Sequence, residues 1–323
     1  MGDDERVAAS GLVAGRDYPR SYREFRGWFA DDGACAAYLE RLRWPDGFRC
    51  RACGAGGEPW RQTRGRLTCP GCRHQTRVTA GTILDKTRTP LVVWFDAAWH
   101  VTTAKNGMSA KTLERTLGVS YPTAWAMLQR FRVAMVRSER ARLSGTVEVD
   151  ETFVGGVAHD GTTGRGAARK SLVAIAVEVK DPKGFGRTRM RAVDSGAAAD
   201  LIPFVCAAVA PGSVVRTDGW MGYVSLPEHG YTHDRISQRA GGNPAHISMP
   251  AVHRVASLLK RWLLGTHQGA VDPAFLPGYL EEFTFRFNRR TSRSRGLVFR
   301  RLLEQAVVTG PVTAADIVAR ARS

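Results

Sequence analysis

The sequence predicts an α/β protein in which a small metal-binding ribbon and a helical region precede a mixed sheet with flanking helices. Three observations support this prediction. Four of the six cysteines lie in two Cys-x-x-Cys pairs in the N-terminal third. Apolar residues at helical spacing follow these pairs. After residue 145 the pattern changes to apolar strands, and the later strands alternate with helices.

These patterns also predict how the chain is organised, since 323 residues are enough for two or three domains. We expect an N-terminal helical segment at 1–47, the ribbon at 48–89 and the helical region at 90–144. The mixed-sheet domain is expected at 145–303 and a C-terminal tail at 304–323.

The charge of the chain predicts a polyanionic partner. There are 47 Lys and Arg residues against 30 Asp and Glu residues, a formal charge of +17. Because the arginines cluster, nucleic acid is favoured over a merely soluble basic surface. The longest apolar run, at 201–210, is too short to span a membrane, and the acidic N-terminus does not resemble a signal peptide. We therefore expect a cytoplasmic protein with no membrane partner.

The paired cysteines predict a structural zinc site. Two-residue spacing lets two thiolates on one tight turn reach the same ion, and a second such turn, fifteen residues further on, completes a tetrahedral site. A redox pair would need only one such motif. The predicted ligands are Cys50, Cys53, Cys69 and Cys72. Cys35 and Cys206 lie in apolar helical surroundings and are predicted to be packing residues.

Short alternating segments around the cysteine pairs predict the small strands of a zinc ribbon. From Phe48 to Thr89 the chain has nine Lys or Arg residues and two acids, with Trp60 and His74 among them. A surface of this kind is suited to a phosphate backbone. The alternative is a zinc-stapled fold whose charges are only solvated.

Residues 90–142 have the pattern of three helices. The first opens at Pro90 and ends before Gly107, and a short turn at 118–120 separates the second from the third, which has Pro122 near its start. This pattern is typical of a helix-turn-helix, although a helical hairpin without a special function would look the same. The residues expected to be exposed there are Lys111, Arg115, Tyr121, Thr123 and Arg130.

From residue 145 onward the sequence predicts a mixed sheet, because strands come first and then alternate with helices. The expected strands lie at 146–156, 170–180, 186–196 and 212–218, with a fifth at 231–238, and the expected helices at 197–210 and 251–266.

The first of these strands contains three carboxylates, which are costly to bury without a partner or a metal ion. Strand alternation puts Glu148 and Asp150 on one face and Glu151 on the other. Asp218 ends the fourth strand, and open sheets commonly have their sites near strand ends. We expect the two aspartates to converge on a pair of Mg²⁺ or Mn²⁺ ions, since carboxylate oxygens suit these metals.

Two further expectations concern the neighbouring glutamates. Glu148 is expected to support the metal ligand Asp150 without binding the metal itself. Glu151 should be paired or lie at the sheet margin. Taken alone, each aspartate would also suit a turn or a helix cap.

Several linked motifs resemble those of bacterial insertion-sequence transposases that have an N-terminal zinc ribbon and a ribonuclease-H-like DDE domain. The motifs are RWPDGFRCRACG, the cysteine pairs, VEVDETFVGG, TDGWMGY, LLKRWLLGTHQG and YLEEFTFRFNRR. The likeness extends from Tyr18 to about Leu303. It implies metal-dependent strand cleavage and strand transfer on double-stranded DNA, at the element ends and the target, by a nucleoid-associated homo-oligomer.

The resemblance also implies roles for particular residues. Asp150 and Asp218 match the first two catalytic acids, and Lys260 matches a lysine that contacts DNA phosphate. The third acid, seven residues before that lysine, is replaced by His253. Seven residues are close to two helical turns, so His253 and Lys260 share a helix face. We expect an active DDH variant in which the imidazole binds the metal; the alternative is a packing histidine on a half-buried helix.

An arginine-rich stretch near the C-terminus predicts a phosphate-binding edge, because seven arginines and no acid lie between Arg286 and Arg301. The expected DNA contacts in it are Arg286, Arg289, Arg290, Arg293 and Arg295. Two other functions remain open. One is a DNA-binding regulator that has lost its chemistry, which the histidine would favour, and the other is a stand-alone nuclease of the same fold.

Overall fold

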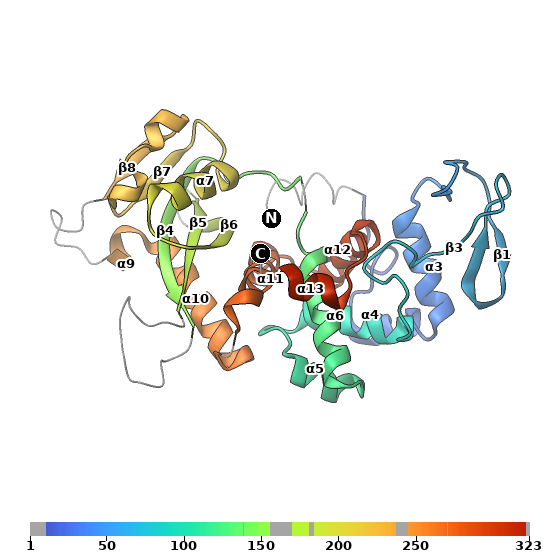
Figure 1. Ribbon diagram of the computed structural model, residues 1–323. Helices are drawn as coiled ribbons and strands as arrows, with labels where there is room; N and C mark the ends of the chain where they lie inside the picture. Colours follow the sequence, from blue (N-terminus) through green and yellow to red (C-terminus); the bar gives the residue numbers. More distant parts are fainter. Residues whose placement is uncertain are drawn as a thin grey trace. The chain divides into compact units, whose positions relative to one another are not determined.

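Figure 1 shows the computed structural model of the chain. It describes residues 11–137, 139–155, 170–180, 184–236, 245–269 and 271–320. These residues form two compact units, one within Ser138–Thr291 and the other from Ala8–Arg137 together with Ser292–Ala319. The outermost residues of the predicted N-terminal segment and C-terminal tail lie outside the described ranges. Within those ranges, no helix is both long enough and apolar enough to cross a membrane.

The unit within Ser138–Thr291, called the sheet unit below, is built on a five-stranded mixed sheet with strand order β6-β5-β4-β7-β8. Its strands are β4 (Thr146–Val154), β5 (Ser171–Val179), β6 (Phe185–Val193), β7 (Val214–Thr217) and β8 (Thr232–Arg235). The central strand β4 runs antiparallel to β5 and parallel to β7. The predicted mixed sheet is therefore confirmed, including the fifth strand.

Helices cover both faces of this sheet (Figure 1). On one face α7 (Ala198–Ala208) packs over Val147 and Val149. On the other, α10 (Pro250–His267) and α11 (Leu276–Asn288) pack over Val154 and Val173. Side chains alternate along β4, so this one strand contributes to both cores. The shorter elements of the unit are η2 (Met221–Tyr223), η3 (Leu226–His229), α9 (Ala245–Ser248) and η4 (Pro273–Phe275).

The other unit, called the ribbon unit below, contains the zinc ribbon and most of the remaining helices. The ribbon is an antiparallel sheet of β1 (Trp60–Gln62), β2 (Arg66–Thr68) and β3 (Gln75–Arg77), with the turn η1 (Thr63–Gly65) between the first two strands. The helices are α2 (Tyr22–Trp28), α3 (Asp32–Arg43), α4 (Leu91–Thr103), α5 (Ala110–Leu117), α6 (Tyr121–Ala134), α12 (Arg295–Val308) and α13 (Ala314–Arg320).

An aromatic core holds α12 in this second unit. Phe299 on α12 is fully buried, and its ring centroid lies 5.4 Å from that of Phe25 and 5.8 Å from those of Phe29 and Phe95. The helix therefore packs against α3, α4 and α6. The sequence predicted that the sheet domain would extend to residue 303 and be followed by a tail at 304–323. Instead, α12 belongs to the other unit, because its apolar face packs against helices of the N-terminal third of the chain.

Candidate functional site

The register of β4 and β7 brings the two predicted aspartates to the same end of the sheet. Glu148 is paired with Arg216 in this parallel pair, so Asp150 and Asp218 each lie two residues beyond the last paired position. Burial raises the pKa of Asp150, and the neighbouring Asp218 carboxylate adds to this effect. A cation between the two carboxylates would remove that electrostatic cost.

Helix α10 carries His253 to the same place. Its Nε2 atom lies 3.8 Å from Oδ2 of Asp150, and both side chains are half-buried. Among the described residues this buried nitrogen has no hydrogen-bond partner. An imidazole nitrogen without a partner beside the Asp150 carboxylate is suited to binding a divalent ion together with that carboxylate.

Glu148 connects α10 to the central strand. Its side chain is only 1% exposed, and its Oε2 atom accepts hydrogen bonds from the N–H groups of Ala251 (2.8 Å) and Val252 (2.9 Å). These amides lie in the first turn of α10, where N–H groups have no partner within the helix. The residue before the helix, Met249, provides no side-chain cap. Glu148 therefore caps the helix that carries His253, which is a different form of support from the one expected.

Glu151 lies on the opposite face of β4, as strand alternation predicts. It is not at the sheet margin, because β4 is the central strand and Glu151 is near Tyr223, whose side chain is fully buried. Burial raises the pKa of Glu151 to about 7, and the Asp150 charge contributes to the increase. Burial also raises the pKa of Tyr223, and the nearby Glu151 carboxylate raises it further.

Exposed cations continue along α10 beyond His253. Lys260 is exposed, and so are Arg254 and Arg261. In the part of the chain that the structure describes, no ion pair involves these three side chains. Arg254 and Arg261 were not among the predicted DNA contacts, although their seven-residue spacing puts them on one helix face.

The predicted zinc ligands converge in the ribbon. The four sulfur atoms lie within 4.8 Å of one another. The Sγ atoms of Cys50 and Cys72 are 3.6 Å apart, and those of Cys53 and Cys69 are 3.7 Å apart. A tetrahedral zinc ion with bonds of about 2.3 Å requires sulfur separations of about 3.8 Å, so the cluster fits a Cys₄ zinc site.

The backbone prepares these cysteines for metal binding. Each pair sits on a tight turn, closed by hydrogen bonds of 2.9 Å from Gly54 N–H to the Cys50 carbonyl and from Arg73 N–H to the Cys69 carbonyl. A backbone hydrogen bond from Cys53 lowers the pKa of the Cys50 thiol to about 6. The pKa of the neighbouring Cys72 thiol is raised to about 12, so only part of the cluster favours the thiolate, the form that binds metal. Cys35 is fully buried and Cys206 is partly buried in α7, as expected of packing residues.

Helices α5 and α6 pack against each other and are separated by the predicted short turn at 118–120. Gly118, with φ of +66°, ends α5, and the Ser120 side chain caps α6. Lys111, Arg115 and Tyr121 are exposed as expected.

Two other residues of the hairpin are not exposed as predicted. The hydroxyl of half-buried Thr123 lies 2.9 Å from that of Ser120. Arg130 is also half-buried; it donates a hydrogen bond of 3.0 Å to the Val312 carbonyl and lies over the Trp94 ring. Its side chain therefore packs within the unit.

The arginine-rich stretch separates into two kinds of side chain. Arg286 forms an ion pair of 3.7 Å with the buried Glu282, and the Arg289 guanidinium lies 4.0 Å from the centre of the Phe285 ring. Arg293 and Arg295, in contrast, are exposed. The prediction of one continuous phosphate-binding edge is therefore wrong for the first part of the stretch, whose side chains pack within the sheet unit.

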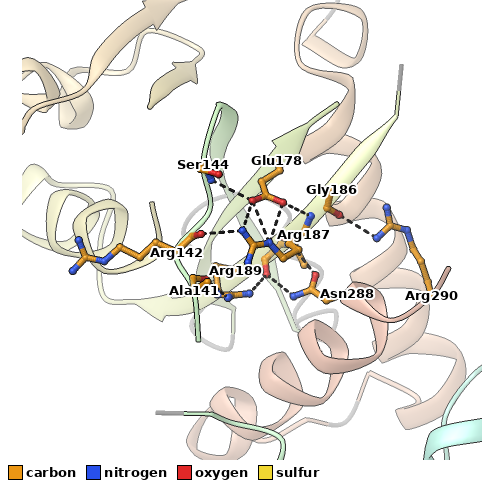
Figure 2. A network of polar contacts seen from close by, with 10 residues as sticks. Ala141, Arg142, Ser144, Glu178, Gly186, Arg187, Arg189, Asn288 and Arg290 are labelled. Atoms are coloured by element: carbon orange, nitrogen blue, oxygen red, sulfur yellow. Dashed lines mark hydrogen bonds and ion pairs between the residues drawn. The ribbon is translucent and has the colours of Figure 1, made fainter. Parts of the chain in front are cut away.

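Arg290 belongs to a polar network that holds α11 against β6 (Figure 2). It donates a hydrogen bond of 3.1 Å to the Gly186 carbonyl, and its guanidinium covers the Phe287 ring at 3.9 Å. In the same network Glu178 accepts hydrogen bonds from Arg187, the shortest being 2.7 Å. Burial lowers the pKa of Arg290. These contacts explain why so basic a stretch is partly buried.

Comparison with known protein families agrees with both parts of this description. The ISXO2-like transposase domain matches residues 142–288, and the transposase zinc-ribbon domain matches residues 30–75. None of the curated proteins compared with the chain matches it.

The fold, the cysteine cluster and the two matches define a transposase with a zinc ribbon and a DDE-type domain, in agreement with the predicted ribonuclease-H-like fold. The chain therefore contains a transposase zinc-ribbon domain followed by an ISXO2-like transposase domain.

Proposed function

We propose that the protein is an active transposase that cleaves DNA strands at the ends of its insertion sequence and joins them to a target. Asp150, Asp218 and His253 would hold the catalytic divalent ions. The observation that supports this most directly is the position of His253, whose Nε2 lies 3.8 Å from the Asp150 carboxylate, at the sheet end where Asp218 follows the neighbouring strand.

The ligand set has consequences for the metal. Bound Mg²⁺ or Mn²⁺ would stabilise the attacking and leaving oxygens of a phosphodiester displacement. A set of two carboxylates and one imidazole carries one negative charge fewer than three carboxylates. Because nitrogen ligands suit Mn²⁺ better than Mg²⁺, we expect higher activity with Mn²⁺.

The remaining residues of the site would position the metal-binding helix and bind the DNA backbone. Glu148 would keep α10, and therefore His253, against the central strand. Lys260, two turns further along the same helix, would bind a phosphate of the cleaved strand. Arg254 and Arg261, exposed on that helix, would extend the contact along the backbone.

Double-stranded DNA is the proposed partner, at both the element ends and the target. The formal charge of +17 favours it. The ribbon unit also has a cavity of about 360 Å³ whose lining includes Arg66, Arg77 and Lys86, which suits a phosphate group. By likeness to other DDE enzymes, we expect a homo-oligomer that binds paired ends.

The test is a strand-cleavage assay on the element's own ends, with Mg²⁺ and Mn²⁺ compared. Asp150→Ala and Asp218→Ala should each reduce cleavage at least about a thousandfold, since each removes a charged metal ligand. DNA affinity should be retained. Asp194→Ala is the matched control, because it removes an exposed carboxylate of the same unit. Cleavage by Asp150→Ala at the wild-type rate would exclude the proposed site.

Two alternatives predict different results in the same assay. A regulator that has lost its chemistry would bind the ends without metal-dependent cleavage; the histidine at position 253 is the observation that favours it. A stand-alone nuclease would cleave the ends without joining them to a target.

A further inference from the structure

A small apolar surface adjoins the metal site. It consists of Trp220, Met221 and Val224, which are 48%, 69% and 44% exposed. These residues lie in and around η2, directly after the strand end that carries Asp218. Exposed apolar side chains grouped together commonly mark a binding site.

The indole of Trp220 is held in place although nearly half of the side chain is exposed. Its Nε1–H donates a hydrogen bond of 2.7 Å to the Gly196 carbonyl. Its backbone N–H donates one of 2.9 Å to the Asp218 carboxylate. Trp220 is therefore attached both to the loop before α7 and to a proposed metal ligand.

Two glycines make room for this arrangement. A Cβ atom at Gly222 would lie 2.6 Å from the Gly196 carbonyl oxygen and 3.1 Å from Cδ1 of Trp220. A Cβ atom at Gly196 would lie 3.4 Å from the indole nitrogen. Larger residues at position 222 would displace the indole or its acceptor. A ring fixed in this way loses little conformational entropy when a ligand binds to its exposed face.

We propose that Trp220 stacks on a nucleobase of the DNA strand that is cleaved at this site. The inference rests on the proposed function. If Asp218 holds an ion at the cleaved phosphate, the base of the adjoining nucleotide is the flat, apolar group nearest to the indole. Every base has such a face, so the contact would favour an exposed base without requiring a particular sequence.

This contact has a consequence for the DNA. A base inside a duplex is already stacked on both sides, so it must leave the helix before it can reach Trp220. Unstacking costs least when the base is mismatched or unpaired. The wild-type protein should therefore bind and cleave ends with a mismatch beside the cleaved phosphate better than fully paired ends.

The experiment uses the full chain and element-end DNA that carries an unpaired 2-aminopurine beside the cleaved phosphate, so that the probe is unstacked and bright in the free DNA. Stacking quenches the fluorescence of this base. In the wild type we expect quenching and a preference for the mismatched end. Trp220→Ala should lose both and cleave about 10- to 100-fold more slowly, as expected for one lost base stack. Trp220→Phe, which keeps a ring, should restore most of the quenching. Leu264→Ala is the control, because Leu264 is an exposed apolar side chain of the same unit.

The outcomes separate the possible roles. Equal quenching by wild type and Trp220→Ala would overturn the inference. Equal loss in Trp220→Ala and Trp220→Phe, with a lower melting temperature, would also overturn it, since the indole would then only support the fold. A change in oligomeric state without a change in quenching would assign the surface to a protein partner.

Failure of this inference is distinguishable from failure of the proposed function. Asp150→Ala should abolish cleavage and keep the quenching. If the wild type cleaves and Trp220→Ala cleaves equally well, only the base contact is wrong. If the wild type binds the ends without cleaving them, the proposed function is wrong, and with it the inference.

Discussion

Glu148 and Val252 lie 104 positions apart in the chain and are joined by a hydrogen bond of 2.9 Å from the Val252 amide to the Glu148 carboxylate. The residue after Val252 is His253. The distance between the imidazole and Asp150 therefore depends on a cap that comes from the strand and not from the helix's own N-terminal residues.

Removing this cap should weaken metal binding as well as the fold. Glu148→Ala leaves two amide groups of α10 without a partner, and we expect a loss of about 1–3 kcal/mol in the free energy of unfolding. Cleavage should then need a higher Mn²⁺ concentration. Glu148→Gln keeps an acceptor oxygen and should stay close to wild type in both measurements. If Glu148→Ala lowers stability but leaves the Mn²⁺ dependence unchanged, the cap does not position His253.

Replacing His253 tests its role as a ligand. His253→Ala should nearly abolish cleavage, whereas His253→Glu restores a third carboxylate and should shift the preference towards Mg²⁺. The measurement is the cleavage rate per folded molecule with each ion. A packing histidine would behave differently: His253→Ala would lower the melting temperature and leave the rate nearly unchanged.

Zinc should be part of the folded ribbon. Purified protein should contain about one zinc ion per chain, and Cys69→Ser should lose it and unfold the ribbon more than the sheet unit. Elemental analysis and hydrogen exchange of the two units measure these effects. Cys35→Ala is the control, since Cys35 is buried in α3, outside the cluster, and the variant should keep its zinc. Wild-type protein without zinc would contradict the prediction.

The Glu178–Arg187 pair should make the stability of the sheet unit depend on pH. Burial alone would raise the pKa of Glu178, but the hydrogen bonds from Arg187 outweigh it and lower the pKa. A carboxyl group with a lowered pKa stabilises the fold above its unfolded pKa of about 4.3, and that stability is lost as the pH falls through the folded value.

Glu178→Gln should therefore be about 1–2 kcal/mol less stable than wild type at pH 7, and the difference should shrink below about pH 4. Thermal unfolding at a series of pH values measures it. Asp194→Asn, at an exposed position, should track the wild type throughout. A difference that stays constant with pH would mean that the charge of Glu178 contributes nothing.

Replacing two arginines that follow α11 should have different effects, one on stability and the other on DNA binding. Arg290 donates to the Gly186 carbonyl (Figure 2), so Arg290→Ala should lower the melting temperature of the sheet unit. Arg293 is exposed, so Arg293→Ala should leave the melting temperature unchanged and weaken DNA binding. The slope of log affinity against log salt should then fall by about 0.9, as for one lost phosphate contact. Equal melting temperatures of the two variants would contradict the structure.

The sequence was sufficient to predict the strands of the sheet, the cysteine cluster of the ribbon, and the position of Asp150 and Asp218 at the same end of neighbouring strands. Each of these follows from local signals: alternation within a strand, spacing within a cysteine pair, and an acid at a strand end. The resemblance to DDE transposases singled out His253, and the seven-residue spacing put it on the same helix face as Lys260.

The residues whose burial or partners the sequence did not predict have a different physical cause in common. Arg130, Arg286 and Arg290 look like surface cations in the sequence, because charge usually stays in water. Arg286 is paired with Glu282 four residues earlier on the same helix, and the sequence does not show that this glutamate is buried. The carbonyl partners of Arg130 and Arg290 lie instead on other elements, which periodicity does not show. The same holds for Glu148, whose amide partners lie on a helix more than a hundred residues away.

The position of α12 in the aromatic core has a consequence for synthesis of the protein. Phe299 completes a cluster that begins with Phe25, yet the whole sheet unit lies between them in the chain. On the ribosome, the sheet unit can assemble while the N-terminal unit still lacks one of its helices. A nascent chain therefore acquires its complete ribbon unit last, and a product terminated before α12 would lack part of that core.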